Sequence, residues 1–114
     1  MYGLSMENQV QYALVLTTYP DEAAAKQFAQ QLVEQKLGAC VNVMPEMTSI
    51  YEWDGKLEQG RECQLIIKTQ HSKLQALSDY ILENHPYELP EILEIPISSG
   101  LPAYLNWISE SLKG

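Results

Sequence analysis

The sequence predicts a single α+β domain of the split βαβ kind, with the element order βαββαβ followed by one more helix. Extended stretches rich in β-branched and aromatic residues alternate with amphipathic helical segments along the chain. The 114 residues suffice for one domain, and 46% apolar with 19% charged residues are typical of a globular protein. We assign residues 10–114 to this domain. Residues 1–9 are expected to be a flexible N-terminus or a cloning remnant, because Met6 is a candidate second start.

The first strand and helix are marked by a proline and an acidic pair. Residues 11–18 form a strand that ends before Pro20. Asp21 and Glu22 then place negative charge where a helix begins. The helix is predicted to continue to about Leu37, with Gly38 as its C-cap. Its apolar face consists of Ala25, Phe28, Ala29, Leu32, Val33 and Leu37.

A long hairpin is predicted in the middle of the chain. Two extended stretches, 39–44 and 48–53, lead into Asp54-Gly55 and a return strand at 56–69. Asp-Gly favours a two-residue type I′ turn, because both residues tolerate positive φ angles. This turn predicts two cross-strand pairs, Trp53 with Lys56 and Tyr51 with Glu58.

A second helix, a short strand and a third helix complete the chain. The second helix covers 73–84 and is closed by Asn84 and Pro86. The prolines that flank the strand at 91–96 suit the edge of a sheet. The last helix begins near Pro102. The residues predicted to be buried by these two helices are Leu74, Leu77, Ile81 and Leu82, then Leu105, Ile108 and Leu112.

The predicted strands are apolar on both faces. In the first strand Leu14 and Leu16 point to one side, while Ala13 and Val15 point to the other. Both main helices of a split βαβ fold cover the same face, and one C-terminal helix is too narrow to cover the other. We therefore expect a homo-oligomer of closed cyclic symmetry, in which the aromatic hairpin contacts a neighbouring subunit.

Charge and composition narrow the function classes. The net charge of −8 disfavours binding to nucleic acid or to anionic membranes. Without a signal-like or membrane-spanning stretch, a cytoplasmic location is expected. Cys40 and Cys63 lack metal-site spacing and are expected to be reduced core residues. No catalytic motif with a nucleophile and a base is present, so an enzyme is not expected.

The segment 84–91 is the candidate binding site. Two prolines stiffen a loop that carries His85, Glu88 and Glu91. Imidazole with carboxylates suits copper, zinc or a similar divalent cation. The alternative is that His85 only caps the preceding helix and that Glu88 is solvated, and spacing alone favours this alternative.

Five segments together resemble one family, the CutA divalent-cation tolerance proteins. They are VLTTYPDE at 15–22, KLGACVNVMP at 36–45, TSIYEWDGKLE at 48–58, HPYELPEI at 85–92 and YLNWI at 104–108. The resemblance covers about residues 12–112. It implies a ferredoxin-like α+β sandwich, a homotrimer formed by strand pairing between subunits, and a link to copper and other divalent cations.

The same resemblance implies metal contacts at His85 and Glu91, which match the histidine and glutamate of the copper-linked bacterial members. Thr17 stands where those members have a cysteine, and Asn84 replaces their first histidine. Two expected ligands are therefore missing, and copper binding should be weak. No organic cofactor is expected.

Four functional hypotheses follow. The leading one is a trimeric cytoplasmic protein of divalent-cation tolerance. The second is a signalling module similar to the PII proteins, in which a cleft around Trp53, Lys68 and Tyr87 binds an effector or a protein. The third is a hydrolase that uses His85 with Glu91 as an acid–base pair, although no nucleophile is evident. The fourth is a rigid scaffold without a ligand.

Overall fold

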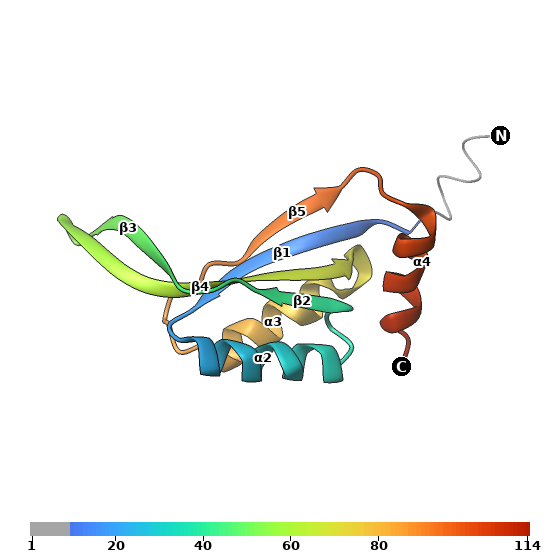
Figure 1. Ribbon diagram of the computed structural model, residues 1–114, viewed down its shortest axis with the longest axis horizontal. Helices are drawn as coiled ribbons and strands as arrows, with labels where there is room; N and C mark the ends of the chain where they lie inside the picture. Colours follow the sequence, from blue (N-terminus) through green and yellow to red (C-terminus); the bar gives the residue numbers. More distant parts are fainter. Residues whose placement is uncertain (1–9) are drawn as a thin grey trace.

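The computed structural model describes residues 10–114 (Figure 1). The expected N-terminal segment, residues 1–9, lies outside the described residues. The remaining chain forms the predicted elements in the predicted order, with a 3-10 turn, η1, before the second main helix. Their bounds are β1 Tyr12–Tyr19, α2 Glu22–Glu34, β2 Cys40–Val43, β3 Met47–Trp53, β4 Lys56–Gln70, η1 His71–Lys73, α3 Leu74–Asn84, β5 Leu93–Ile97 and α4 Pro102–Ser111.

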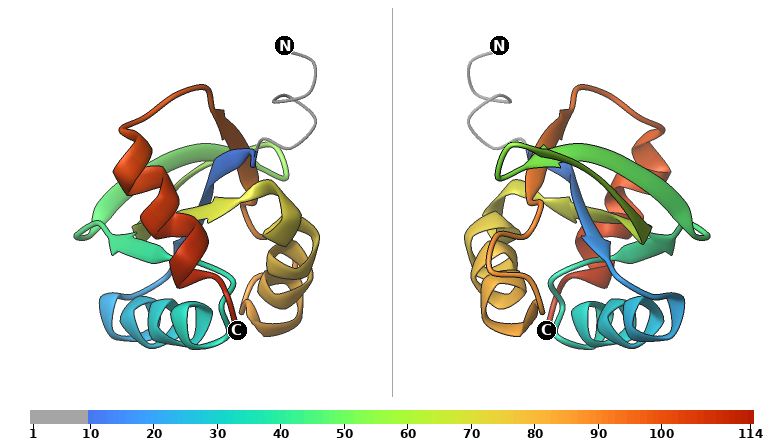
Figure 2. Two further views of the ribbon diagram at one scale, coloured as in Figure 1. Left: turned by 90° about the vertical axis from the view of Figure 1, so that its right-hand side faces the viewer. Right: turned by 90° about the vertical axis from the view of Figure 1, so that its left-hand side faces the viewer.

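The sheet is antiparallel, and β4 pairs with β1, β2 and β3. The strand order is β2-β4-β1-β5, and β3 pairs with the outer half of β4 beyond the end of β1. Helices α2 and α3 lie side by side on one face, whereas α4 lies across one end of the sheet (Figures 1 and 2). None of the helices within residues 10–114 has the length and apolar character needed to span a bilayer.

The core lies between the sheet and the two side-by-side helices. Alternate residues of β1 and β4 point into it, as the two-residue period of a strand requires. Val33 and Leu82 were predicted to be buried, but they lie on the outer sides of α2 and α3 and are exposed. Cys63 is buried, whereas Cys40 is only half-buried, and both thiols are free. The fully enclosed side chains of this core include Val15, Leu32, Cys63, Leu65, Ile67, Leu77 and Ile81.

The start of α2 follows the prediction, but its end does not. The Asp21 carboxylate caps the first turn by accepting the backbone N–H of Ala24 at 2.8 Å. The helix ends at Glu34 rather than near Leu37, and Lys36 adopts the left-handed conformation with φ of 60°. The Leu37 N–H bonds back to the Leu32 carbonyl at 3.0 Å, so the end is a Schellman motif.

Gly38 serves close packing rather than the helix end. A Cβ atom at this position would lie 2.8 Å from the Cγ2 atom of Ile67 on β4. The absence of a side chain therefore allows the chain that leaves α2 to pass directly over the sheet.

The hairpin of β3 and β4 has the predicted turn and register. Asp54 and Gly55 have φ angles of 56° and 77°, as a type I′ turn requires. Trp53 pairs with Lys56 and Tyr51 with Glu58. The hairpin extends well beyond the helices as an arm (Figure 1).

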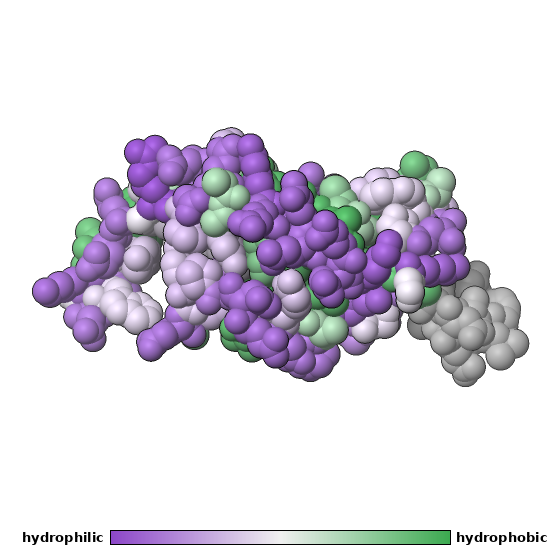
Figure 3. Space-filling view, turned by 90° about the horizontal axis from the view of Figure 1, so that it is seen from below, coloured by the Kyte–Doolittle hydropathy of each residue, from purple (hydrophilic) through white to green (hydrophobic). Residues whose placement is uncertain are grey.

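The sheet face opposite α2 and α3 is largely uncovered in one chain. Its apolar side chains come from three neighbouring strands, and in β5 they are 40–53% exposed. By contrast, the outer surface of the two helices is mostly hydrophilic (Figure 3). We call the uncovered face of the sheet the open face. Its central residues are Leu14, Leu16, Ile66, Leu93 and Ile95.

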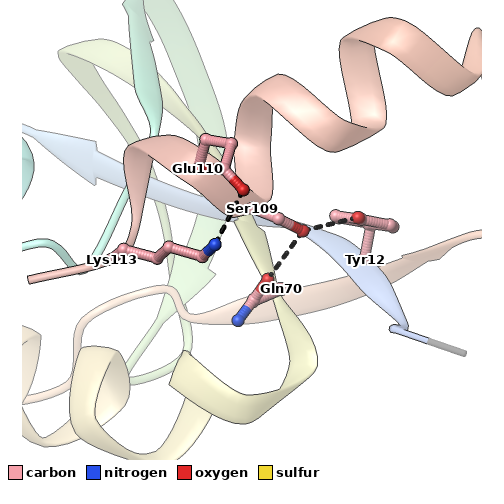
Figure 4. A network of polar contacts seen from close by, with 5 residues as sticks. All are labelled: Tyr12, Gln70, Ser109, Glu110 and Lys113. Carbon is pink, nitrogen blue, oxygen red and sulfur yellow. Dashed lines mark hydrogen bonds and ion pairs between the residues drawn. The ribbon is translucent and has the colours of Figure 1, made fainter. Parts of the chain in front are cut away.

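Helix α4 covers only one end of the open face. Ile108 and Leu112 are buried there. The hydroxyl groups of Tyr12 and Ser109 lie 2.6 Å apart, and Ser109 also donates to the Gln70 side chain at 3.2 Å (Figure 4). These contacts fix α4 to β1 and β4, and they leave the middle of the open face without a covering element among residues 10–114.

Candidate functional site

A cleft of about 700 Å³ separates the hairpin arm from the loop that follows α3. One wall comes from β3 and β4 and the other from residues 87–91, with Thr18 at the end of β1 between them. The cleft is lined by Thr18, Tyr51, Trp53, Glu58, Gly60, Arg61, Glu62, Tyr87, Glu88, Leu89 and Glu91.

A run of ring contacts, one stacked and two tilted, positions the loop beside the cleft. Tyr19 lies between Phe28 of α2 and His85, with ring centroids 4.8 Å and 4.7 Å away. The Tyr87 ring lies 4.8 Å from the His85 ring on its other side. The Tyr19 hydroxyl also donates to the backbone carbonyl of Asn84 at 3.1 Å. The end of α3 is therefore held against β1 and α2.

Both ring nitrogens of His85 already have hydrogen-bond partners. The backbone N–H of Tyr87 donates to Nδ1 at 3.0 Å, so Nδ1 carries no proton. Nε2 then carries the proton and donates to the Thr18 carbonyl at 2.6 Å. The backbone N–H of His85 caps α3 by bonding to Ile81. The ring thus bonds to β1 and to its own loop rather than to the last carbonyls of α3, and His85 could bind a metal only after its ring hydrogen bonding changes.

Glu91 is held by a neighbouring amide. The Gln64 side chain donates to the Thr17 carbonyl at 2.7 Å and to the Glu91 carboxylate at 3.2 Å. The Thr17 hydroxyl is buried on the helix side of the sheet without a partner among the described residues. Within residues 10–114, no three His, Cys, Asp or Glu side chains are grouped to hold a metal ion. One chain therefore brings Glu91 into the cleft but does not assemble a complete metal site.

The cleft is nevertheless strongly acidic. Glu58 and Glu62 line it from β4, and Glu88 and Glu91 line it from the loop. None of these four carboxylates has an ion-pair partner within residues 10–114, because the one lining cation, Arg61, is bound 2.7 Å from Glu46. Of these four residues, only Glu88 and Glu91 were predicted from the sequence as candidate site residues. The predicted hairpin register could have added Glu58, since it sets this residue beside Tyr51.

The second hypothesis placed Trp53, Lys68 and Tyr87 around one cleft, which is partly wrong. Trp53 and Tyr87 do line the same cleft. Lys68 lies at the other end of β4, where its ammonium group is 3.4 Å from the Tyr104 hydroxyl on α4. Lys68 pairs with Leu14 in register, so it belongs to the open face.

Tyr87 is held at the cleft wall by an acidic neighbour. Its hydroxyl donates to the Glu62 carboxylate at 3.2 Å. Desolvation, followed by the negative charge of Glu62, raises the pKa of Tyr87 to about 12. The unfolded chain releases this proton near pH 10, so the stabilisation is complete below pH 10 and is lost as the pH rises to about 12.

We expect Tyr87→Phe to remove the loss of folding stability that the Tyr87 hydroxyl causes between pH 10 and pH 12. The wild type should lose on the order of 1 kcal/mol more than the variant between pH 10 and pH 12, allowing for solvent screening at a partly exposed group. Urea unfolding of both proteins at each pH measures the difference. A Tyr104→Phe control should behave as the wild type, and identical pH profiles for Tyr87→Phe and the wild type would contradict the assignment.

The fold and the cleft define a class of small α+β proteins with an antiparallel sheet, two helices on one face and an acidic cleft beside a hairpin arm. Residues 13–111 match the family described as CutA1 divalent ion tolerance protein, and the chain belongs to this family.

Known relatives cover most of this chain. "Protein CutA homolog" of Xenopus laevis is 52% identical over 93 residues, which are 82% of this chain and 62% of that protein. This chain therefore spans less than two thirds of the animal relative. "Divalent-cation tolerance protein CutA" of Yersinia pestis (strain Pestoides F) is 46% identical, with 92% of this chain and 91% of that protein covered. A solved structure from Archaeoglobus fulgidus, described as a periplasmic divalent cation tolerance protein, has a TM-score of 0.86 and 35% identity, and covers 90% of this chain and 99% of that one.

Proposed function

We propose that this protein is a homotrimer of ferredoxin-like subunits that serves divalent-cation tolerance by binding the ions weakly in the acidic cleft. The observation that carries the proposal is the set of four carboxylates that line the cleft without ion-pair partners among the described residues. Carboxylates without ion-pair partners give the cleft a negative potential, which attracts a divalent cation. Family membership supports the link to divalent ions.

Glu91 and His85 are the proposed metal contacts. Glu91 already faces the cleft, and among residues 10–114 only the neutral Gln64 amide holds its carboxylate. His85 would join through Nε2 after both of its ring hydrogen bonds break, because a proton moved from Nε2 to Nδ1 displaces the Tyr87 N–H. Since residues 10–114 hold no group of three metal-ligating side chains, we propose that a neighbouring subunit completes the site.

Copper is the proposed ion, but with low affinity. Thr17 offers a buried hydroxyl in place of a thiolate, and the Asn84 amide is already bound to the Tyr80 carbonyl at 2.9 Å. Copper gains most from thiolate and imidazole ligands, so a site built on one histidine and carboxylates should bind it less tightly. We propose binding without turnover, in the cytoplasm.

The open face supports the proposed trimer. Its apolar side chains would remain in contact with water in an isolated chain, and a second copy of the same chain is the simplest partner that covers them. The hairpin arm adds exposed apolar side chains at Ile50, Trp53 and Leu57.

Calorimetric titration with Cu²⁺ and Zn²⁺ tests the metal contacts, at a pH where imidazole is largely neutral. We expect saturable binding of one ion per chain, and His85→Ala and Glu91→Gln should each weaken it about tenfold or more. The matched controls are His71→Ala and Glu83→Gln, which change exposed residues outside the cleft. Binding that His85→Ala leaves unchanged would show that His85 is not a metal contact.

A second candidate function is effector binding of the PII kind. The observation that favours it is the size of the cleft together with its three aromatic side chains, since about 300–1,000 Å³ is usual for small-molecule sites. A thermal-shift screen with metabolites in the presence of a chelator separates this function from metal binding.

A further inference from the structure

Helix α4 is attached to the rest of the fold by a small apolar cluster of its own. Ile108 and Leu112 on the helix are buried with Ala39, and Tyr12 and Leu105 are partly buried beside them. None of these residues belongs to the core between the sheet and helices α2 and α3. The main core can therefore stay intact when the contacts of α4 are lost.

The sequence of α4 gives this helix little stability away from the sheet. It has 10 residues, and no side chain among residues 10–114 caps its N-terminus. Isolated helices shorter than about 12 residues are marginal in water. Residues 98–101, which connect β5 to α4, are exposed and belong to neither a strand nor a helix. An undocked α4 should therefore unfold, and the exposed connection allows this without displacing β5.

Polar contacts from two strands hold α4 in its docked position. The Ser109 hydroxyl lies 2.6 Å from the Tyr12 hydroxyl on β1 and donates to the Gln70 side chain on β4 at 3.2 Å (Figure 4). Lys68 on β4 donates to the Tyr104 hydroxyl at 3.4 Å. One hydrogen bond of this kind changes an equilibrium constant by about fivefold. Since Ser109 makes two of the contacts, it has the largest effect on the balance between docked and undocked α4.

We propose that α4 undocks and unfolds as one unit while the sheet, α2 and α3 stay folded, and that Ser109 sets how often this occurs. Weakly attached elements open at a lower free energy than the whole domain unfolds. Undocking uncovers Tyr12, which continues the side of β1 that carries Leu14 and Leu16. The open face then extends to the end of the sheet, so α4 limits the area that a second copy of the chain can reach. This behaviour does not depend on metal binding.

Hydrogen–deuterium exchange of the full chain, followed by mass spectrometry of its peptides, tests the proposal. After correction for intrinsic rates, we expect the amides of α4 to exchange at least tenfold faster than those of α2 and α3. Ser109→Ala removes two hydrogen bonds and should speed exchange in α4 about tenfold further, with α2 and α3 unchanged. The matched control is Ser111→Ala, which makes the same change in the same helix, where the serine side chain has no hydrogen bond to the described residues.

Each alternative result overturns a defined part of the proposal. If α4 exchanges as slowly as α2, the helix does not open by itself, as would follow if a neighbouring copy held its exposed Tyr104 and Trp107. If Ser109→Ala speeds exchange in α2 and α3 as much as in α4, the helix opens only when the whole domain unfolds. If Ser109→Ala and Ser111→Ala behave alike, Ser109 does not control the docking of α4.

Discussion

Replacing Ile66 by lysine should convert the proposed trimer to a monomer. Ile66 lies on β4 in the middle of the open face, in register with Leu16 of β1. A trimer formed through this face would bury three lysine charges without partners, which costs more than the apolar contacts gain. Sedimentation should show the wild type at three times the chain mass of 12.9 kDa and Ile66→Lys at the chain mass.

The monomeric variant should remain folded. Ile66 points away from the helices and does not belong to the core beneath the sheet, so the loss of assembly is separable from unfolding. Gln30→Lys makes the same change of charge on the exposed side of α2 and should remain trimeric. A wild type that sediments as a single chain would exclude the proposed trimer. An Ile66→Lys variant that stays trimeric would place the interface outside the open face.

Local sequence signals predicted most of the fold. Asp54-Gly55 determined the turn, and the turn determined the register of the arm, because a two-residue hairpin leaves only one pairing. Asp21 marked the start of α2 for a similar reason, since a helix cap bonds within one turn. Each of these features depends on residues that are close together in the chain.

Features that depend on distant residues were predicted poorly. Gly38 was predicted to be a helix cap. Its lack of a side chain is instead required by the close approach of Ile67, which becomes a neighbour only after folding. The two hydrogen bonds of the His85 ring include one to Thr18, 67 positions earlier, so the sequence could show the imidazole but not its partners. The cleft itself forms only where the arm and the 87–91 loop approach each other.

Replacing Leu77 by alanine should destabilise the fold by about 2–5 kcal/mol. Leu77 is fully buried on the side of α3 that faces the sheet. Alanine removes most of the apolar side chain and leaves a cavity among neighbours that the sheet holds in place. Because α3 also carries His85 at its end, the loosened helix should make the 85–91 loop more mobile. Urea unfolding at a fixed chain concentration measures the loss of stability.

Leu82 provides the matched control, because it lies on the same helix with its side chain 57% exposed. Leu82→Ala removes the same atoms and makes the same change in helix propensity, so only the burial differs. We expect it to change the free energy of unfolding by less than about 0.5 kcal/mol. Equal losses in the two variants would mean that α3 does not pack on the sheet through Leu77. A large loss in Leu77→Ala alone would show that α3 packs on the sheet through Leu77, and α3 in turn leads directly into the loop that carries Glu91.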